Sequence, residues 1–211
     1  YEKVIEIFEN RRAGEKLFLF DLTMQNHGGY STLDTDITVT SLNTESIQAN
    51  LYLSLIRASD VDLEMLVRYF AGQEEPVIIC MYGDHQPKLD DSFYESIYAQ
   101  TEGLTERDMV LNKYKTPFII WANYDIPEQE GMEIGMSYLG AMLMDIAGVP
   151  VSPYFHFLQQ YMQKYPVITV NGYTDQTGNH YDWAQDTSQV WEYSVLQYHY
   201  LFDEEREDWG Y

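Results

Sequence analysis

The stretch of sequence that decides the fold is Val77-Ile78-Ile79-Cys80-Met81-Tyr82-Gly83-Asp84-His85-Gln86-Pro87. It starts as an apolar run with β-branched residues and is closed by a glycine and then a proline, a pattern typical of a buried strand in a parallel sheet. In such sheets the loops that leave the carboxyl ends of the strands carry the functional site. Asp84 and His85 are therefore the first candidate site residues, and a functional site would need partners for them from elsewhere in the chain.

The charge balance narrows the classes of partner. The chain has 34 acidic and 12 basic residues among 211, and its formal net charge is −22. Without a basic stripe, nucleic acid is excluded as an expected partner, and docking on anionic lipid through this region is disfavoured. Apolar residues make up 45% of the chain, which indicates a packed core. We expect a single domain over residues 1–211, because no internal repeat or Ser/Gly linker interrupts it.

The single cysteine, Cys80, lies inside the predicted strand, so we expect it to be a small buried hydrophobic residue. One cysteine cannot form an intrachain disulfide. No stretch approaches the roughly 20 consecutive apolar residues of a membrane span, and no signal peptide opens the chain. The chain begins at Tyr1 without a methionine, and we expect it to be part of a longer protein.

A second histidine is predicted at the end of a neighbouring strand. Residues 17–23 are interpreted as a short strand that leads to His27, where two glycines allow a sharp turn. Residues 45–71 carry apolar side chains at helical spacing. Strand, helix and strand in this order predict a right-handed parallel crossover, which brings the carboxyl ends of both strands to one edge of the sheet. His27 is therefore expected within reach of Asp84 and His85.

The predicted fold class is α/β, with a mostly parallel sheet flanked by helices. Further helices are expected at residues 1–12, 92–100, 136–147 and 153–164, and further strands at 116–122 and 167–170. Residues 101–115 are interpreted as a polar loop, 173–186 as turn-rich, and 203–208 as an acidic tail. Residues 191–202 fit either a final helix or a β segment, because their alternating tyrosines are compatible with both.

Carboxylate and imidazole groups side by side suit Mn²⁺, Zn²⁺ or iron better than Ca²⁺. The pair alone has low specificity, because Asp84 could cap the following turn while His85 packs on Pro87. The apolar strand before the pair and the second strand ending in a histidine favour a functional site. Three other histidines are expected to pack or to form turns instead of binding a metal: His156, His180 and His199. The late tyrosines fit either a sugar-stacking surface or ordinary packing.

These motifs carry a family resemblance. Gly83-Asp84-His85-x-Pro87 after an apolar strand resembles the metal-binding motif of the lipoteichoic acid synthase and phosphoglycerol transferase branch of the sulfatases, in the alkaline phosphatase superfamily. Residues 23–30 and 116–121 are similar to that branch's upstream segment and to its next core strand. The resemblance is clear over roughly residues 1–125. It implies a partial alkaline phosphatase/sulfatase-like sandwich, the carboxyl-terminal portion of a catalytic domain.

The resemblance also implies roles for the candidate residues. Asp84 and His85 would be two ligands of one divalent cation, with Mn²⁺ expected and Zn²⁺, Mg²⁺ or Ca²⁺ as alternatives. His27 would contact phosphate or sulfate oxygens of the substrate. The nucleophile of the family, a Thr or a modified Cys or Ser, matches no position of this chain, and Cys80 lacks the surrounding motif. We therefore expect these residues alone to bind Mn²⁺ weakly and to turn over no substrate.

The implied activity is metal-dependent phosphoryl or sulfuryl transfer on cell-envelope glycerophosphate or on sulfate and phosphate esters, including lipid-linked glycerophosphate. The resemblance implies a parent protein on the extracellular face of a bacterial membrane, attached through an amino-terminal region outside this chain. Two alternatives stay open. One is a non-catalytic sulfatase-fold binding module, which metal content would distinguish. The other is general phosphodiester or pyrophosphate hydrolysis, which substrate profiling would distinguish.

Overall fold

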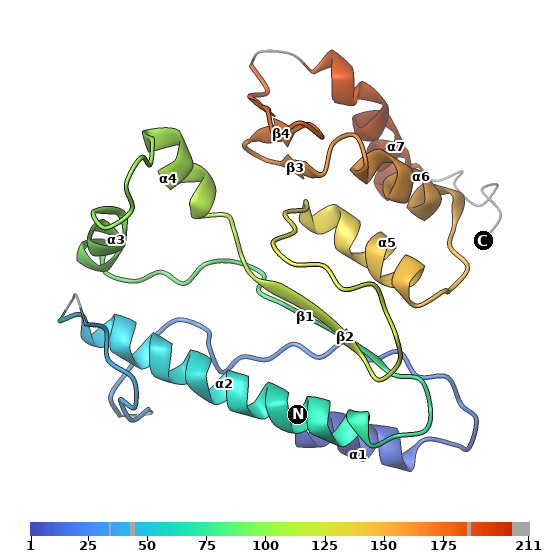
Figure 1. The fold of residues 1–211 in the computed structure, drawn as a ribbon, viewed down its shortest axis with the longest axis horizontal. Coiled ribbons are helices and arrows are strands. Elements are labelled where there is room, and N and C mark those ends of the chain that lie inside the picture. The colour runs from blue at the N-terminus through green and yellow to red at the C-terminus, as the bar shows by residue number, and fades with distance from the viewer. Residues whose placement is uncertain (34, 43–44, 185–186, 204–211) are drawn as a thin grey trace. The chain divides into compact units, whose positions relative to one another are not determined.

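The computed structural model describes residues 1–33, 35–42, 45–184 and 187–203 and combines helices with short strands (Figure 1). These residues group into two compact units, Tyr1–Tyr124 and Asp125–Tyr211. The single domain expected over residues 1–211 stays a prediction. Among the helices of the described ranges, none has the length and apolar character needed to cross a membrane.

The first unit is built on a long central helix, α2, which spans Ile47–Ala71. The helix starts at Ser46, whose hydroxyl accepts a 3.1 Å hydrogen bond from the Ala49 N–H, and it ends before Gly72. The helix predicted for residues 45–71 is thereby confirmed. The other elements of this unit are α1 (Glu2–Asn10), β1 (Ile78–Tyr82), α3 (Asp91–Tyr98), α4 (Glu106–Asn112) and β2 (Phe118–Ala122).

Aromatic contacts hold α1 against the carboxyl-terminal end of α2. The Phe8 ring lies edge-on to Phe70 at 5.0 Å and to Tyr69 at 6.3 Å between ring centroids. The Tyr69 hydroxyl donates a 3.0 Å hydrogen bond to Glu9 Oε1. Edge-to-face pairs of this kind add about 0.5–1.5 kcal/mol beyond the burial of their area. The short helix α1 is therefore stabilised by tertiary packing.

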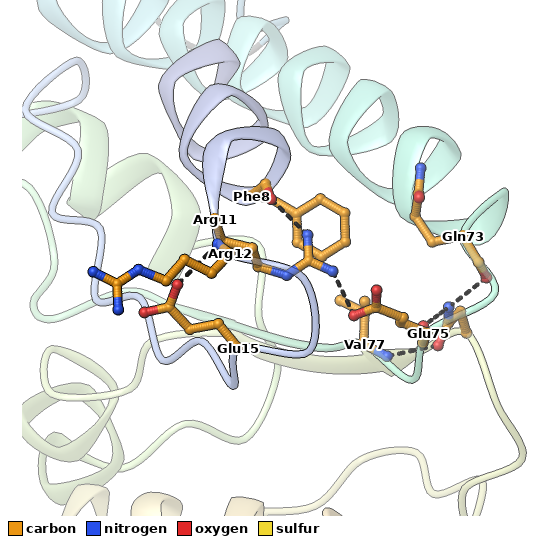
Figure 2. Close-up of polar contacts among 8 residues, drawn as sticks. Phe8, Arg11, Arg12, Glu15, Gln73, Glu75 and Val77 are labelled. Carbon is orange, nitrogen blue, oxygen red and sulfur yellow. Dashed lines mark hydrogen bonds and ion pairs between the residues drawn. The ribbon is translucent and has the colours of Figure 1, made fainter.

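Arg11 connects the end of α1 to the loop before β1, as Figure 2 shows. Its guanidinium lies 3.6 Å from the centroid of the Phe8 ring and donates a 2.5 Å hydrogen bond to the Phe8 carbonyl oxygen. The same group forms an ion pair with Glu75. Only 12% of the Arg11 side chain is exposed, so water screens these interactions less than it would at the surface.

Asn123 fixes the turn between α2 and β1. Its Nδ2 donates to the carbonyl oxygens of Phe70, Gln73 and Glu75 at 3.2, 3.1 and 2.8 Å. Its Oδ1 accepts a 2.7 Å hydrogen bond from the Val77 N–H. One side chain thus pairs backbone groups on both sides of the turn and sets where β1 begins. The residue directly follows β2, so it also joins the start of β1 to the end of its partner strand.

The strand pairing differs from the predicted parallel sheet. β1 and β2 run antiparallel, with Cα partners that include Ile78 with Ala122 and Tyr82 with Phe118. Every strand pair in the described ranges is antiparallel, so the expectation of a mostly parallel sheet is wrong for these residues. The apolar run of residues 77–82 indicated burial, which carries no information on strand direction. With one partner strand, β1 is also half-buried instead of fully buried.

Residues 17–23 form no strand, so the predicted parallel crossover is absent from the described part of the chain. The exposure of the side chains nevertheless alternates along this segment. Phe18, Phe20 and Leu22 are 80%, 68% and 66% exposed, whereas Leu17 and Leu19 are about half as exposed, at 40% and 38%. A strand requires a hydrogen-bonded neighbour in addition to the right side chains. This segment has no strand neighbour in the described ranges.

The second unit packs three helices with a small antiparallel sheet (Figure 1). Its core consists largely of tyrosines, and the packing interpretation holds for Tyr173 and Tyr193, which are 1% and 4% exposed. Residues 191–202 form a helix and no β segment. The elements are α5 (Met136–Ile146), α6 (Pro153–Met162), β3 (Val167–Thr169), β4 (Gly172–Thr174), β5 (His180–Tyr181), the 3₁₀ helix η1 (Ser188–Val190) and α7 (Trp191–Phe202).

Residues 173–186, which were expected to be turn-rich, include β5 and most of β4. A tight turn at residues 175–178 brings these two strands together as an antiparallel pair. Residues 185–186 of that region lie outside the described residues. The predicted acidic tail lies outside them as well, except for Asp203, whose backbone N–H donates a 3.0 Å hydrogen bond to the His199 carbonyl oxygen.

Candidate metal centre

Asp84 and His85 lie where the chain leaves β1, as the sequence predicted. Their side chains are 69% and 68% exposed, so both are open to an approaching ligand. Asp84 Oδ1 accepts a 2.9 Å hydrogen bond from the backbone N–H of His85. This bond fixes the carboxylate on the loop through one oxygen. The second oxygen, Oδ2, faces the imidazole.

The ring of His85 is held in one tautomer. Its Nδ1 lies 2.9 Å from the carbonyl oxygen of Gln86, and a carbonyl oxygen only accepts hydrogen bonds. In the neutral ring, Nδ1 therefore carries the hydrogen and Nε2 presents its lone pair. Histidines that bind metals commonly donate their other ring N–H to a carbonyl or carboxylate, which fixes the ring. His85 has this arrangement before any metal is considered.

The separation of the two free donor atoms fits a shared cation. Asp84 Oδ2 and His85 Nε2 lie 3.7 Å apart. Two atoms that each lie about 2.0–2.2 Å from one ion, as with zinc, are at most about 4.4 Å apart. The described residues contain no group of three or more His, Cys, Asp or Glu side chains close enough to hold a metal. In the described part of the chain the loop thus brings together two candidate donor atoms, and their role as metal ligands stays a prediction.

The loop is fastened to the residues that lead into β2. Gly83 donates its N–H to the Pro117 carbonyl oxygen at 3.0 Å, and its own carbonyl oxygen accepts a 2.7 Å hydrogen bond from the Thr116 hydroxyl. After the candidate ligands, Gln86 Nε2 donates to the Lys115 carbonyl oxygen. The antiparallel pairing makes this possible, because it places the entry of β2 beside the exit of β1. Thr116 was predicted as the start of a strand and not as a site residue.

His27 lies in an exposed turn of the same unit. Its backbone N–H donates a 3.1 Å hydrogen bond to the Met24 carbonyl oxygen. The neighbouring Asn26 donates a 3.0 Å hydrogen bond to Ser59 of α2, which ties the turn to that helix. Among the described residues no hydrogen bond or ion pair joins the His27 side chain to Asp84 or His85, so its predicted role in substrate binding stays a prediction.

Cys80 is half-buried in β1, and burial raises the pKa of its thiol. A raised pKa keeps the sulfur protonated and unreactive at neutral pH, in keeping with its expected structural role.

The other histidines have local partners. His180 is half-buried in β5, where Nε2 lies 3.0 Å from the Asn171 carbonyl oxygen. His156 and His199 are exposed, so the expectation that they pack was wrong for these two. His156 contacts Gln160 and His199 pairs with Asp203.

Two comparisons with individual proteins relate this chain to known relatives. It is 24% identical over 169 residues to a Rhizobium meliloti (strain 1021) protein whose name proposes cyclic β-1,2-glucan modification, covering 73% of this chain and 25% of the relative. The solved phosphoglycerol transferase GacH from Streptococcus pyogenes, in complex with sn-glycerol-1-phosphate, matches with a TM-score of 0.62 and 22% identity. That match covers 92% of this chain and 44% of GacH, so this chain spans less than half of either relative.

The likeness to GacH shows the fold, and it confirms the predicted α/β class. The model of the Sulfatase family matches residues 1–149, which include both candidate metal ligands and His27. This region accounts for most of the chain and contains every motif on which the sequence resemblance depended. The chain belongs to the sulfatase family.

Proposed function

We propose that this chain is part of a sulfatase-like catalytic domain in which Asp84 and His85 supply two ligands to one divalent cation, with Mn²⁺ expected. The observation that carries the proposal is the pair of free donor atoms, Asp84 Oδ2 and His85 Nε2, held 3.7 Å apart on an exposed loop. A carboxylate oxygen and a neutral imidazole nitrogen suit Mn²⁺ or Zn²⁺. The remaining ligands and the nucleophile would come from other parts of the protein.

The proposed reaction is phosphoryl or sulfuryl transfer. A bound cation would polarise a phosphoryl or sulfuryl oxygen and stabilise the charge that develops on it. His27 would donate a hydrogen bond to a non-bridging oxygen of the transferring group, or a proton to the leaving oxygen. No residue of this chain is assigned as nucleophile, so we expect these 211 residues alone to be inactive.

The proposed substrate is a phosphate or sulfate ester of the cell envelope, with a glycerophosphate ester as the first candidate. Support comes from GacH, which is a phosphoglycerol transferase solved with sn-glycerol-1-phosphate. The Rhizobium relative, whose name proposes modification of a glucan, is compatible with a saccharide acceptor. Substrates of this kind would put the whole protein on the extracellular face of a bacterial membrane.

The test is Mn²⁺-dependent turnover of a glycerophosphate diester by the whole protein. The variants are His85→Gln and His27→Ala, with the exposed His156→Gln as the matched control. We expect His85→Gln and His27→Ala to lose activity by at least about 100-fold, a typical loss for a catalytic or ligand group. Full activity in His85→Gln would contradict the metal role. A whole protein that binds no metal would instead support the alternative of a non-catalytic binding module.

A further inference from the structure

Gly83, the residue just before the candidate ligands, is hydrogen-bonded through both of its backbone polar groups to the dipeptide Thr116-Pro117. The Gly83 N–H donates to the Pro117 carbonyl oxygen at 3.0 Å, and the Gly83 carbonyl oxygen accepts from the Thr116 hydroxyl at 2.7 Å. The first bond continues the β1–β2 ladder. The second hydrogen bond comes from a side chain and ends on the peptide group that joins Gly83 to Asp84. The direction in which the chain enters the ligand pair thus depends on the Thr116 hydroxyl.

Close packing supports the same bond. A Cβ added to Gly83 would lie 3.2 Å from Thr116 Cβ and 3.5 Å from Thr116 Cγ2. The absence of a side chain at Gly83 therefore allows the Thr116 side chain to come against the backbone. Because threonine is branched at Cβ, its side chain has few available rotamers. Thr116 is half-buried, so its hydroxyl bond competes with water less than an exposed one would.

A second fastening lies just after the ligands. Gln86 Nε2 donates to the carbonyl oxygen of Lys115, the residue before Thr116. The carbonyl oxygen of Gln86 is the group that holds His85 Nδ1. The two candidate ligands are thus bracketed by contacts to residues 115–117, one on each side. The backbone on both sides of the two donor atoms is thus held by residues that lead into β2.

We propose that Thr116 is a positioning residue for the metal site, which orients Asp84 and His85 through its hydrogen bond to the Gly83 carbonyl oxygen. This inference rests on the proposed function, because it assumes that the two residues bind a cation. Thr116 touches neither donor atom in this arrangement. Its hydrogen bond restricts the loop before the cation binds, so that less conformational entropy is lost on binding.

The test measures Mn²⁺ affinity by titration calorimetry in the whole protein, with no substrate present. Thr116→Val keeps the branched shape and removes the hydroxyl, whereas Thr116→Ser keeps the hydroxyl. We expect the Kd for Mn²⁺ to rise about tenfold in Thr116→Val, since outer-sphere partners typically contribute 10–100-fold. Thr116→Ser should stay within about threefold of the wild type. The stability control is Asn123→Ala, which loosens the far end of the same strand pair and should leave the Kd unchanged.

The outcomes distinguish an error in the proposed metal site from an error in the proposed role of Thr116. If Asp84→Asn weakens Mn²⁺ binding and Thr116→Val does not, the positioning role is wrong and the metal site stands. If Asp84→Asn leaves the Kd unchanged, the metal site is wrong and the positioning role falls with it. Should Thr116→Val fail to fold, Thr116→Ala removes the same hydroxyl and is expected to raise the Kd about tenfold as well. An unchanged Kd in a folded Thr116→Ala would then overturn the inference.

Discussion

The free carboxylate oxygen of Asp84 and the free imidazole nitrogen of His85 lie 3.7 Å apart, on adjacent residues of one exposed loop. Adjacent side chains often point in different directions, so this arrangement requires a cause. Two local hydrogen bonds provide it. Asp84 Oδ1 accepts from the His85 N–H, and His85 Nδ1 donates to the Gln86 carbonyl oxygen. The hydrogen bonds of the loop therefore hold both donor atoms on one side.

Asn123→Ala should destabilise the first unit. The Asn123 side chain pairs three carbonyl oxygens and the Val77 N–H, and the substitution removes these four hydrogen bonds, three of which are partly buried. We expect the free energy of unfolding to fall by about 2–3 kcal/mol, measured by urea denaturation. Asn10→Ala is the control, because the Asn10 side chain makes one exposed hydrogen bond to a helix carbonyl. Equal effects of the two substitutions would contradict the role of Asn123.

Gly172→Ala should disrupt the sheet of the second unit. Gly172 has a φ of +119°, and an added Cβ would lie 2.1 Å from the Tyr181 carbonyl oxygen. Since that oxygen belongs to the backbone of β5, it cannot move aside without breaking the strand pair, and we expect a loss of about 3 kcal/mol or more.

Gly178→Ala is the matched comparison for Gly172→Ala. Gly178 also has a positive φ, +85°, but an added Cβ there would meet nothing within 4 Å. Only backbone strain of about 1–2 kcal/mol is expected. Thermal unfolding of both variants measures the difference. A Gly178→Ala variant that is the less stable of the two would show that the close approach of β4 and β5 is not the cause.

Acid should destabilise the turn between β4 and β5 through Asp175. Hydrogen bonds from the Thr177 hydroxyl and N–H, the Tyr181 hydroxyl and the Asn179 N–H hold the pKa of this carboxyl well below its ordinary value of 3.8. Because the folded-state pKa is lowered, the carboxylate stabilises the fold above the unfolded-state pKa. This contribution is lost as the pH falls from about 3.8 toward the lowered pKa.

The measurement for Asp175 is the melting temperature between pH 2 and pH 7. Asp175→Asn should lower the melting temperature at pH 7 and should flatten its fall in acid, because the amide does not titrate. The exposed Asp125→Asn serves as control and should keep the shape of the wild-type curve. If Asp175→Asn and the wild type lose stability in parallel below pH 4, the turn carboxylate is not the group responsible.

Elements with strong local signals could be predicted from the sequence. The periodicity of residues 45–71 led directly to α2, and the apolar runs at 77–82 and 116–122 led to β1 and β2. The start of α4 also has a local signal in the sequence. Residues 101–115 are predicted to be a polar loop, yet Thr105 and Asp108 form a capping box that starts α4. The spacing of a threonine and an acidic residue three positions later was visible in the sequence.

Pairing could not be predicted in the same way, because it depends on residues far away in the chain. The alternation of residues 17–23 is that of a strand, but its hydrogen-bonding neighbours are not encoded in the segment itself. The direction of β1 relative to β2 was likewise open. For the site, the motif predicted Asp84 and His85, whereas the role proposed for Thr116 depends on a backbone contact that only the antiparallel pairing reveals.

The central claim is that Asp84 and His85 bind one divalent cation. Anomalous diffraction from crystals of the whole protein grown with Mn²⁺ tests it most directly. The claim predicts an anomalous peak bonded to both Asp84 Oδ2 and His85 Nε2, at about 2.0–2.3 Å from each. The peak should disappear in Asp84→Asn and persist in the exposed Asp60→Asn. A Mn²⁺ peak bonded to neither residue, or no peak at this loop at saturating Mn²⁺, would contradict the claim.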